Sequence, residues 1–193
     1  MLEQTMQTLT MSRVILASGS PRRYELIKSL GINVEVVPST YDENLDRSKY
    51  KNIGEYVQDL AKYKVQEVYE RLKDTMVALG DTMYGKPKNN SHAFEILSSL
   101  ANKEHTVYTG VCLKTPEREV KFYESTIVKF GDISKEQIQA YVKSGEPLDK
   151  AGAYGIQGVG GCLVEKVYGD FYTVMGMPLY SLAKQLNKIF CNN

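Results

Sequence analysis

The sequence predicts an α/β fold with a mixed, twisted sheet flanked by helices. In the first half of the chain, short apolar runs alternate with segments whose apolar residues keep helical spacing. In the middle, β-rich runs at residues 104–113 and 120–130 suggest an antiparallel pair. No repeat or linker divides the chain. We therefore expect a single domain over residues 13–193, preceded by a flexible leader at residues 1–12.

The expected domain begins with a strand, a turn and a helix. Residues 14–17 are apolar, and small residues follow them. Ser20 is a natural N-cap, Pro21 suits the first helical position, and the helical spacing stops at Gly31. Residues 32–37 alternate in polarity, so they predict a second strand and complete a β-α-β unit.

A polar loop, a long amphipathic helix, a short strand and a further helix come next. Their expected bounds are residues 39–52, 53–73, 75–79 and 91–100. The loop carries an acidic trio, which is Asp42, Glu43 and Asp46. The strand leads into Gly80-Asp81-Thr82.

Beyond the paired β-rich runs, Ser134 and Gln137 form a capping box that opens a helix to about residue 143. Residues 144–161 are rich in glycine and predict an ordered loop. The last two elements are a strand and a closing helix that starts with a proline, expected at residues 162–167 and 178–190.

Composition and charge exclude several classes of protein. The chain is 42% hydrophobic and 24% charged, which is ordinary for a globular protein. Its formal net charge of +1 provides no broad field for nucleic acid or an anionic membrane. It has no signal-peptide pattern, no membrane-length apolar run and only three scattered cysteines. We therefore expect a soluble, cytoplasmic protein with no nucleic-acid or membrane partner.

The stretch LASGSPRR at residues 16–23 is the most informative about function. Backbone N–H groups and the guanidiniums of Arg22 and Arg23 gather at a helix N-terminus, where partial positive charge favours an anion. Arginine also suits bidentate contact with phosphate. The stretch predicts a phosphate site, and the alternative is an ordinary capped helix with two solvated arginines.

Asp81 follows a predicted strand, where ligands gather in open α/β folds. It suits an Mg²⁺ ligand or a general base toward water, and the alternative is an ordinary turn aspartate. Glu43 is a second candidate carboxylate for the metal, against the alternative of an acidic loop. Lys86 in GKP belongs to no P-loop, because the rest of that motif is missing; it is either a phosphate contact or a solvated lysine. Lys64 lies on the polar side of the predicted helix over residues 53–73, and from this pattern alone it is a surface charge.

The segment AYGIQG contains a second candidate binding site. Gly152, Gly155 and Gly158 permit close backbone approach to a flat ligand. Tyr154 offers a ring for stacking, and the Gln157 amide offers a paired donor and acceptor for a base edge. The alternative is a tight loop whose glycines are needed for positive φ. His105, in a predicted strand, is interpreted as structural.

These pieces, in this order, resemble the Maf family of nucleoside triphosphate pyrophosphatases. The matching segments run from residue 14 to about residue 186 and are LASGSPRRYEL, VVPSTYDENLD, YVQDLAKYKV, LGDT, GKP, HTVYTGV, SGEPLDKAGAYGIQG and GDFYTVMGMPL. The resemblance implies a fold like that of inosine triphosphate pyrophosphatases, with two lobes and a central cleft, and a homodimer. It also implies hydrolysis of a nucleoside triphosphate to the monophosphate and pyrophosphate with Mg²⁺ or Mn²⁺.

The resemblance assigns roles to individual residues. Asp81 becomes the proton acceptor that activates water, and Glu43 with Asp81 binds the metal. The phosphate chain is held by Ser18, Arg22, Arg23, Lys64 and Lys86. Base preference is set by Arg22, Thr82 and Gln157.

Within the family, SPRR with DT and YGIQG resembles the branch that acts on dTTP, UTP and modified pyrimidine nucleotides such as 5-methyl-UTP and pseudo-UTP. The 7-methyl-GTP branch tends to carry a tryptophan in the first motif, and this chain has none. The alternatives are a 7-methyl-GTP pyrophosphatase, a non-catalytic nucleotide-binding regulator of cell division, and, more weakly, a nucleic-acid-binding module.

The chain departs from the family's pattern in two places. Gly80 stands where alanine or serine is common. Only Met83 and Tyr84 separate Thr82 from Gly85, where relatives usually carry a longer strand-turn-strand excursion. Either the hairpin is trimmed or a segment is missing from the sequence, and a trimmed hairpin would shift Lys86.

Overall fold

The computed structural model describes residues 5, 7, 9, 14–16, 18–38, 40–41, 45–68, 74–80, 82–115 and 117–190, without the side chains of residues 64–67 and 74–76. The chain divides into two compact units. Unit 1 comprises residues 1–74, 109–124 and 176–193, and unit 2 comprises residues 75–108 and 125–175. Among the described helices, none has the length and apolar character needed to cross a membrane.

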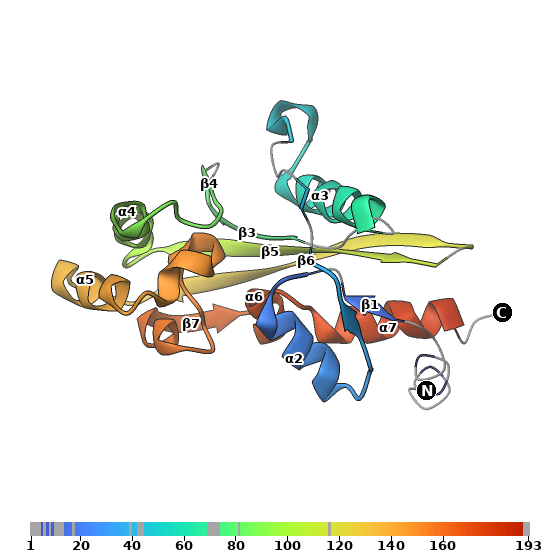
Figure 1. Cartoon of the computed structure of the whole chain (residues 1–193). Helices are drawn as coiled ribbons and strands as arrows, with labels where there is room; N and C mark the ends of the chain where they lie inside the picture. Colours follow the sequence, from blue (N-terminus) through green and yellow to red (C-terminus); the bar gives the residue numbers. More distant parts are fainter. Residues whose placement is uncertain are drawn as a thin grey trace. The chain divides into compact units, whose positions relative to one another are not determined.

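Unit 1 contains the predicted β-α-β arrangement (Figure 1). Strand β1 (Ile15–Leu16) pairs in parallel with β2 (Glu35–Val36), and α2 (Pro21–Ser29) connects them. Both strands are shorter than the apolar pattern predicted. Helix α2 buries Leu26 and Ile27.

Helix α3 (Ile53–Val68) confirms the predicted start of the long amphipathic helix, whose expected last residues, 69–73, lie outside the described part. It buries one face, made by Tyr56, Val57, Leu60 and Ala61. The 3₁₀ helix η1 (Arg47–Lys49) lies in the predicted polar loop. The Asp46 carboxylate caps it by accepting from the Ser48 N–H at 3.1 Å and from its hydroxyl at 2.7 Å.

The closing helix α7 (Leu179–Phe190) begins one residue later than predicted, because Pro178 precedes it and accepts from the Leu182 N–H at 2.9 Å. Near the start of the chain, Thr5 and Leu9 are buried. The Thr5 hydroxyl donates to Asn187 Oδ1 at 3.3 Å. Most residues around them lie outside the description, so the flexible leader stays a prediction.

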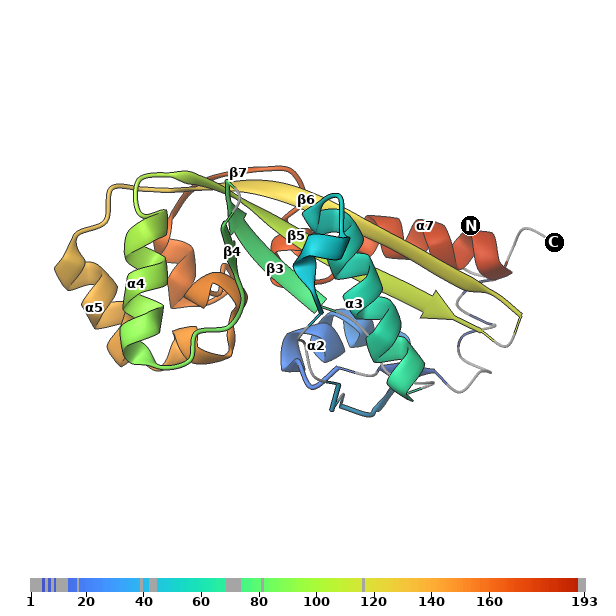
Figure 2. The ribbon, with the colours of Figure 1, turned by 90° about the horizontal axis from the view of Figure 1, so that it is seen from above.

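A five-stranded sheet has the order β4-β3-β5-β6-β7 (Figure 2). Its strands are β3 (Asp74–Leu79), β4 (Thr82–Tyr84), β5 (Glu104–Lys114), β6 (Glu119–Phe130) and β7 (Val164–Tyr168). β3 pairs antiparallel with β4, and β6 with β7. The α/β class is confirmed, with the parallel pair β1-β2 forming a separate two-stranded sheet.

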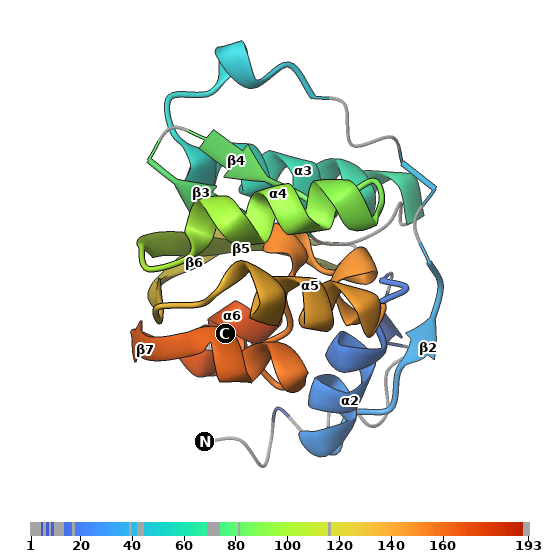
Figure 3. The same cartoon turned by 90° about the vertical axis from the view of Figure 1, so that its left-hand side faces the viewer.

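In unit 2, helices α4 (Asn90–Leu100) and α5 (Lys135–Lys143) lie side by side (Figure 3). The predicted capping box of α5 is confirmed: the Gln137 side chain accepts from the Ser134 N–H at 2.8 Å, and the Ser134 hydroxyl accepts from the Gln137 N–H at 3.3 Å. Apart from alanines, the buried hydrophobic residues of this core are Val77, Ile96, Leu97, Leu100, Val107, Val128, Phe130, Ile138, Tyr141, Val142, Tyr154 and Leu163.

The glycine-rich loop is ordered as predicted and consists largely of short 3₁₀ turns. These are η2 (Glu146–Asp149), η3 (Ala151–Ala153) and η4 (Val159–Leu163). Because η4 takes up residues 162 and 163, strand β7 begins later than predicted, at Val164. The short helix α6 (Phe171–Met175) follows β7.

Candidate functional site

In unit 1, Ser18 and Arg23 are joined at the start of α2. The Arg23 Nη1 group donates to Ser18 Oγ at 2.8 Å, and Arg23 Nε donates to the Gly176 carbonyl oxygen at 3.2 Å. Ser18 is buried, whereas Arg22 and Arg23 are half-buried. Arg23 is therefore fixed at two of its donor groups and is not a simple solvated arginine.

The Ser18 hydroxyl has a defined polarity. It accepts from Arg23 Nη1 and also from the Ser20 N–H at 3.3 Å. A hydroxyl has two acceptor lone pairs and one proton to donate. With both acceptor positions taken, Ser18 has its O–H left for an anion such as a phosphate oxygen.

The start of α2 differs in one respect from the prediction. Ser20 stands at the N-cap and Pro21 at the first helical position, but the Ser20 side chain makes no capping hydrogen bond. The first turn contains no acidic residue, so no carboxylate of its own offsets the positive end of the helix. The predicted N-cap position of Ser20 is confirmed although its side chain does not form the usual bond, and the expectation of a positive helix end stands.

Three of the predicted site residues lie wholly or partly outside the part of the chain that the structure describes. Glu43 and Asp81 fall outside the described residues, as does the side chain of Lys64. Within the described part of the chain, no three His, Cys, Asp or Glu side chains gather as a metal site would require. The metal-binding assignment of Glu43 and Asp81 therefore stays a prediction.

The β3-β4 hairpin brackets the position of Asp81. Leu79 pairs with Thr82, so only two residues connect the strands, and the first of them, Gly80, has φ of +56°. Such a backbone angle favours glycine over any residue with a Cβ. Thr82 begins β4, and Lys86 lies two residues after the end of this strand; both residues are exposed.

The glycine-rich segment (residues 152–161) is tied to this hairpin within unit 2. The Gly152 N–H donates to the Gly85 carbonyl oxygen at 3.1 Å. A Cβ at Gly152 would lie 2.7 Å from Val77 Cγ2, so the backbone here packs directly on β3. The structure thus brings the segments of Thr82, Lys86 and Gln157 into one unit.

Tyr154 does not have the role that its position in AYGIQG suggested. It is buried, and its hydroxyl is hydrogen-bonded to His105 Nε2 at 2.9 Å. Its ring packs edge-on against those of His105 and Phe130. The prediction that Tyr154 stacks on a ligand is therefore wrong, because the ring is part of the core.

His105 is structural, as interpreted from its place in a strand. Burial lowers the pKa of its imidazole to about 4, so the ring is neutral at neutral pH. Burial also raises the pKa of Tyr154. The pair is a neutral hydrogen bond within the core of unit 2.

Gln157 lies at an exposed turn. The Gly158 N–H donates to the Gly155 carbonyl oxygen at 3.1 Å, which closes a turn with Ile156 and Gln157 at its centre. Of the three glycines in AYGIQG and its flank, only Gly152 has positive φ, at +68°. Gly155 and Gly158 are needed for space instead, since a Cβ on either would lie 3.1 or 2.5 Å from Glu146 Oε1.

Glu146 and Tyr141, which no sequence motif indicated, hold this turn through hydrogen bonds. The only signal for Glu146 was an acidic residue at the head of a glycine-rich stretch. A hydrogen-bonded carboxylate of this kind leaves no periodic pattern, so only the folded backbone identifies it.

Comparisons with known proteins agree with the family that the motifs indicate. The sequence profile described as "Maf-like protein" matches residues 13–189. A dTTP/UTP pyrophosphatase of Caldicellulosiruptor bescii is 44% identical, with 93% of this chain and 96% of the relative covered. The dTTP/UTP pyrophosphatase of Aquifex aeolicus is also 44% identical, with 92% and 95% covered.

A human relative is similar over one part of its length. It is named a probable bifunctional dTTP/UTP pyrophosphatase/methyltransferase protein, and it is 42% identical over 92% of this chain. The match covers 32% of the human protein. With a family profile over almost its whole length and relatives well above 30% identity, this chain belongs to the Maf-like protein family.

Proposed function

We propose that this protein is a hydrolase that cleaves dTTP and UTP to the monophosphate and pyrophosphate. Its similarity to relatives named dTTP/UTP pyrophosphatase supports the substrate class. The observation that carries the proposal within the structure is the joined Ser18–Arg23 pair at the start of α2. It combines a hydroxyl poised to donate, a fixed guanidinium and a helix N-terminus, which together suit a phosphate.

The proposed reaction is an attack of water on the α-phosphorus. Asp81 accepts a proton from the water, a P–O bond forms to the water oxygen, and the bond to the bridging oxygen of the β-phosphate breaks. Pyrophosphate leaves with that oxygen. Ser18, Arg22 and Arg23 hold the phosphate chain, with Lys64 and Lys86 adding positive charge.

We also propose that the reaction depends on Mg²⁺ or Mn²⁺. Glu43 and Asp81 supply carboxylate oxygens, the hard donors that these cations prefer, and would hold the ion. When bound, the cation supplies charge neutralisation for the triphosphate. Modified pyrimidine nucleotides, including 5-methyl-UTP and pseudo-UTP, are proposed as further substrates because Thr82 and Gln157 match the residues of that branch. The homodimer likewise stays a proposal.

The test is pyrophosphate release from dTTP, UTP, 5-methyl-UTP, CTP, ATP, GTP and 7-methyl-GTP, each with Mg²⁺, with Mn²⁺ and with a chelator. We expect turnover of the thymine and uracil nucleotides with metal. Loss of the base in Asp81→Asn should lower the rate by about 10²–10⁴-fold. Glu95→Gln, an exposed carboxylate on α4, is the matched control.

Other outcomes assign the protein differently. Preference for 7-methyl-GTP would move it to that branch. Nucleotide binding without turnover under any metal would favour a regulatory role. Near-normal turnover in folded Asp81→Asn would refute the role of Asp81.

A further inference from the structure

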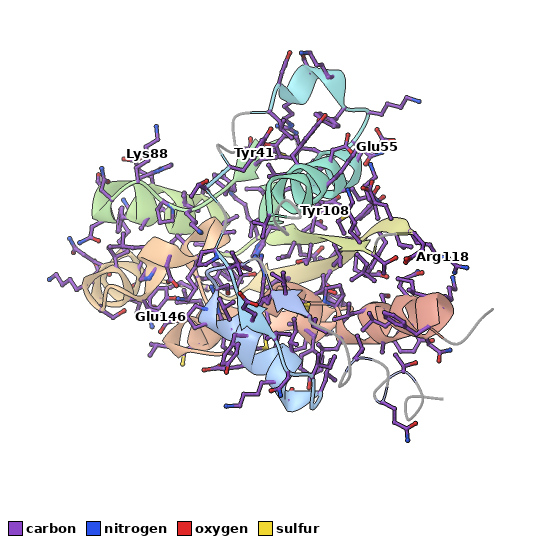
Figure 4. The ribbon with its side chains drawn as sticks, turned by 45° about the vertical axis from the view of Figure 1, so that its right-hand side comes forward. Tyr41, Glu55, Lys88, Tyr108, Arg118 and Glu146 are labelled. Atoms are coloured by element: carbon purple, nitrogen blue, oxygen red, sulfur yellow. The ribbon has the colours of Figure 1, made fainter. Side chains whose placement is uncertain are left out.

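Glu146 accepts hydrogen bonds from three groups of the surrounding chain. Its Oε2 accepts from the Val159 N–H at 3.0 Å, and its Oε1 accepts from the Gly160 N–H at 3.2 Å. The Tyr141 hydroxyl donates to Oε1 at 3.0 Å. Figure 4 labels Glu146, which lies just after α5. A single carboxylate thus binds the backbone that follows the Gln157 turn.

The other end of that turn is bound to the same group through Tyr141. The Gly155 N–H donates to the Tyr141 hydroxyl at 3.2 Å, and that hydroxyl donates to Glu146. The carboxylate also lies directly against the turn, since a Cβ on Gly158 would lie 2.5 Å from Oε1 and 2.8 Å from Oε2. Both ends of the four-residue turn are therefore fixed by one anion and one hydroxyl.

We propose that Glu146 is a positioning residue for nucleotide recognition: its carboxylate fixes the turn that presents Gln157 to the pyrimidine base. The proposal rests on the proposed function. Gln157 is exposed at the centre of the turn, so its amide is available to a ligand while the flanking backbone is held. Without the carboxylate, two backbone N–H groups lose their acceptor and the turn loses its anchor.

Both carboxylate oxygens of Glu146 must act as hydrogen-bond acceptors to hold the turn. Glutamine has nearly the same shape but presents one oxygen and one NH₂ group. In either orientation, the NH₂ group would face a backbone N–H, so Glu146→Gln loses at least one hydrogen bond to a charged acceptor. We expect kcat/KM for dTTP to fall about tenfold, mainly through KM, because such bonds are among the stronger ones.

A double-mutant cycle distinguishes positioning from a general structural role. Gln157→Ala removes the presented amide, and Glu146→Gln in that background should have little further effect on dTTP turnover, within about twofold. The kcat for dTTP should change within about twofold in Glu146→Gln, because the loss falls on KM. Glu95→Gln, whose exposed carboxylate accepts from the Ser91 hydroxyl at 3.4 Å within α4, serves as the control.

Hydrogen exchange tests the anchor independently of turnover. The amides of Val159 and Gly160 should exchange about tenfold faster in Glu146→Gln than in the wild-type protein. Unchanged exchange there would overturn the proposal, and so would additive kinetic effects in the cycle or a loss that falls on kcat rather than on KM. If Glu146→Gln does not fold, Tyr141→Phe replaces it, because this variant removes the hydrogen bonds of the hydroxyl with Glu146 and with the Gly155 N–H.

The results also separate this proposal from the proposed function. A wild-type protein that releases no pyrophosphate from any nucleotide overturns both. A wild-type protein that hydrolyses dTTP, with Gln157→Ala and Glu146→Gln acting independently, overturns only the role of Glu146.

Discussion

Replacement of Gly152 by alanine should destabilise unit 2 for two separable reasons. The first is the backbone, since a φ of +68° costs an alanine about 1–2 kcal/mol. The second is space: a Cβ would lie 2.7 Å from Val77 Cγ2, 2.9 Å from Val77 Cβ and 3.1 Å from Val77 Cγ1. Rotation about χ1 of Val77 moves the two methyl groups but not its Cβ, so the backbone must shift.

The magnitude follows from these contacts. Overpacking of this kind costs about 1–3 kcal/mol, and the lower entropy of the unfolded alanine chain offsets about 0.4–1 kcal/mol. The net loss in the free energy of unfolding should be about 1–4.5 kcal/mol. Gly145→Ala is the matched control, because Gly145 has φ of +78° and nothing within 4 Å of an added Cβ. The difference between the variants is therefore the packing cost alone.

Urea unfolding followed by far-UV circular dichroism measures both variants. At a slope of about 2 kcal/mol per molar, the packing cost separates the two midpoints by about 0.5–1.5 M. Val77→Ala removes two of the three contacts, so it should cost less in the Gly152→Ala background than in the wild-type protein. Equal midpoints for Gly152→Ala and Gly145→Ala would refute the close packing of this segment on β3.

Two further predictions concern the cores of the two units. The pKa of His105 is about 4 in the folded protein and 6.5 in the unfolded chain. The stabilisation that the neutral ring gives to the folded state is therefore complete above pH 6.5 and is lost as the pH falls toward 4. The loss in the free energy of unfolding reaches about 3 kcal/mol at pH 4. Urea unfolding between pH 4 and 7 should show that the free energy of unfolding depends less on pH in His105→Gln than in the wild-type protein. The same pH dependence in both proteins would contradict the burial of the ring. In unit 1, an added Cβ at Gly110 collides with the Val57 carbonyl group, which is backbone of α3 and cannot swing away, so Gly110→Ala should cost at least about 3 kcal/mol. The three atoms nearest to an added Cβ at Gly54 belong to the ring of Tyr123, which is 37% exposed and can rotate, so Gly54→Ala should cost less. Equal costs for the two variants would count against this explanation.

The elements that the sequence predicted best have local signals. The capping box of Ser134 and Gln137 formed with both hydrogen bonds, because the two residues are three apart and need no distant partner. Pro21 marked the start of α2 for the same reason. Ser20 shows the limit of such signals, since its side chain makes no cap bond although its residue type favours one.

The candidate site was predictable only in part. The motifs singled out Ser18, Arg23 and Gln157, but not that Arg23 would be tied to the carbonyl of Gly176, which lies 153 positions away. Tyr154 was misread because an aromatic residue in a glycine-rich segment serves a ligand or a core equally well. Glu146 was missed because its partners are backbone N–H groups, whose positions no residue type encodes.

Unit 1 is assembled from three separate stretches of the chain, and this has a consequence for biosynthesis. Arg23 donates to the carbonyl oxygen of Gly176, which lies in the last of these three stretches and is therefore synthesised after unit 2. Unit 2 is complete in sequence by residue 175, so it can fold while the remainder is still being made. The arginine at the start of α2 acquires its final geometry only after that, and a prematurely terminated product would lack it.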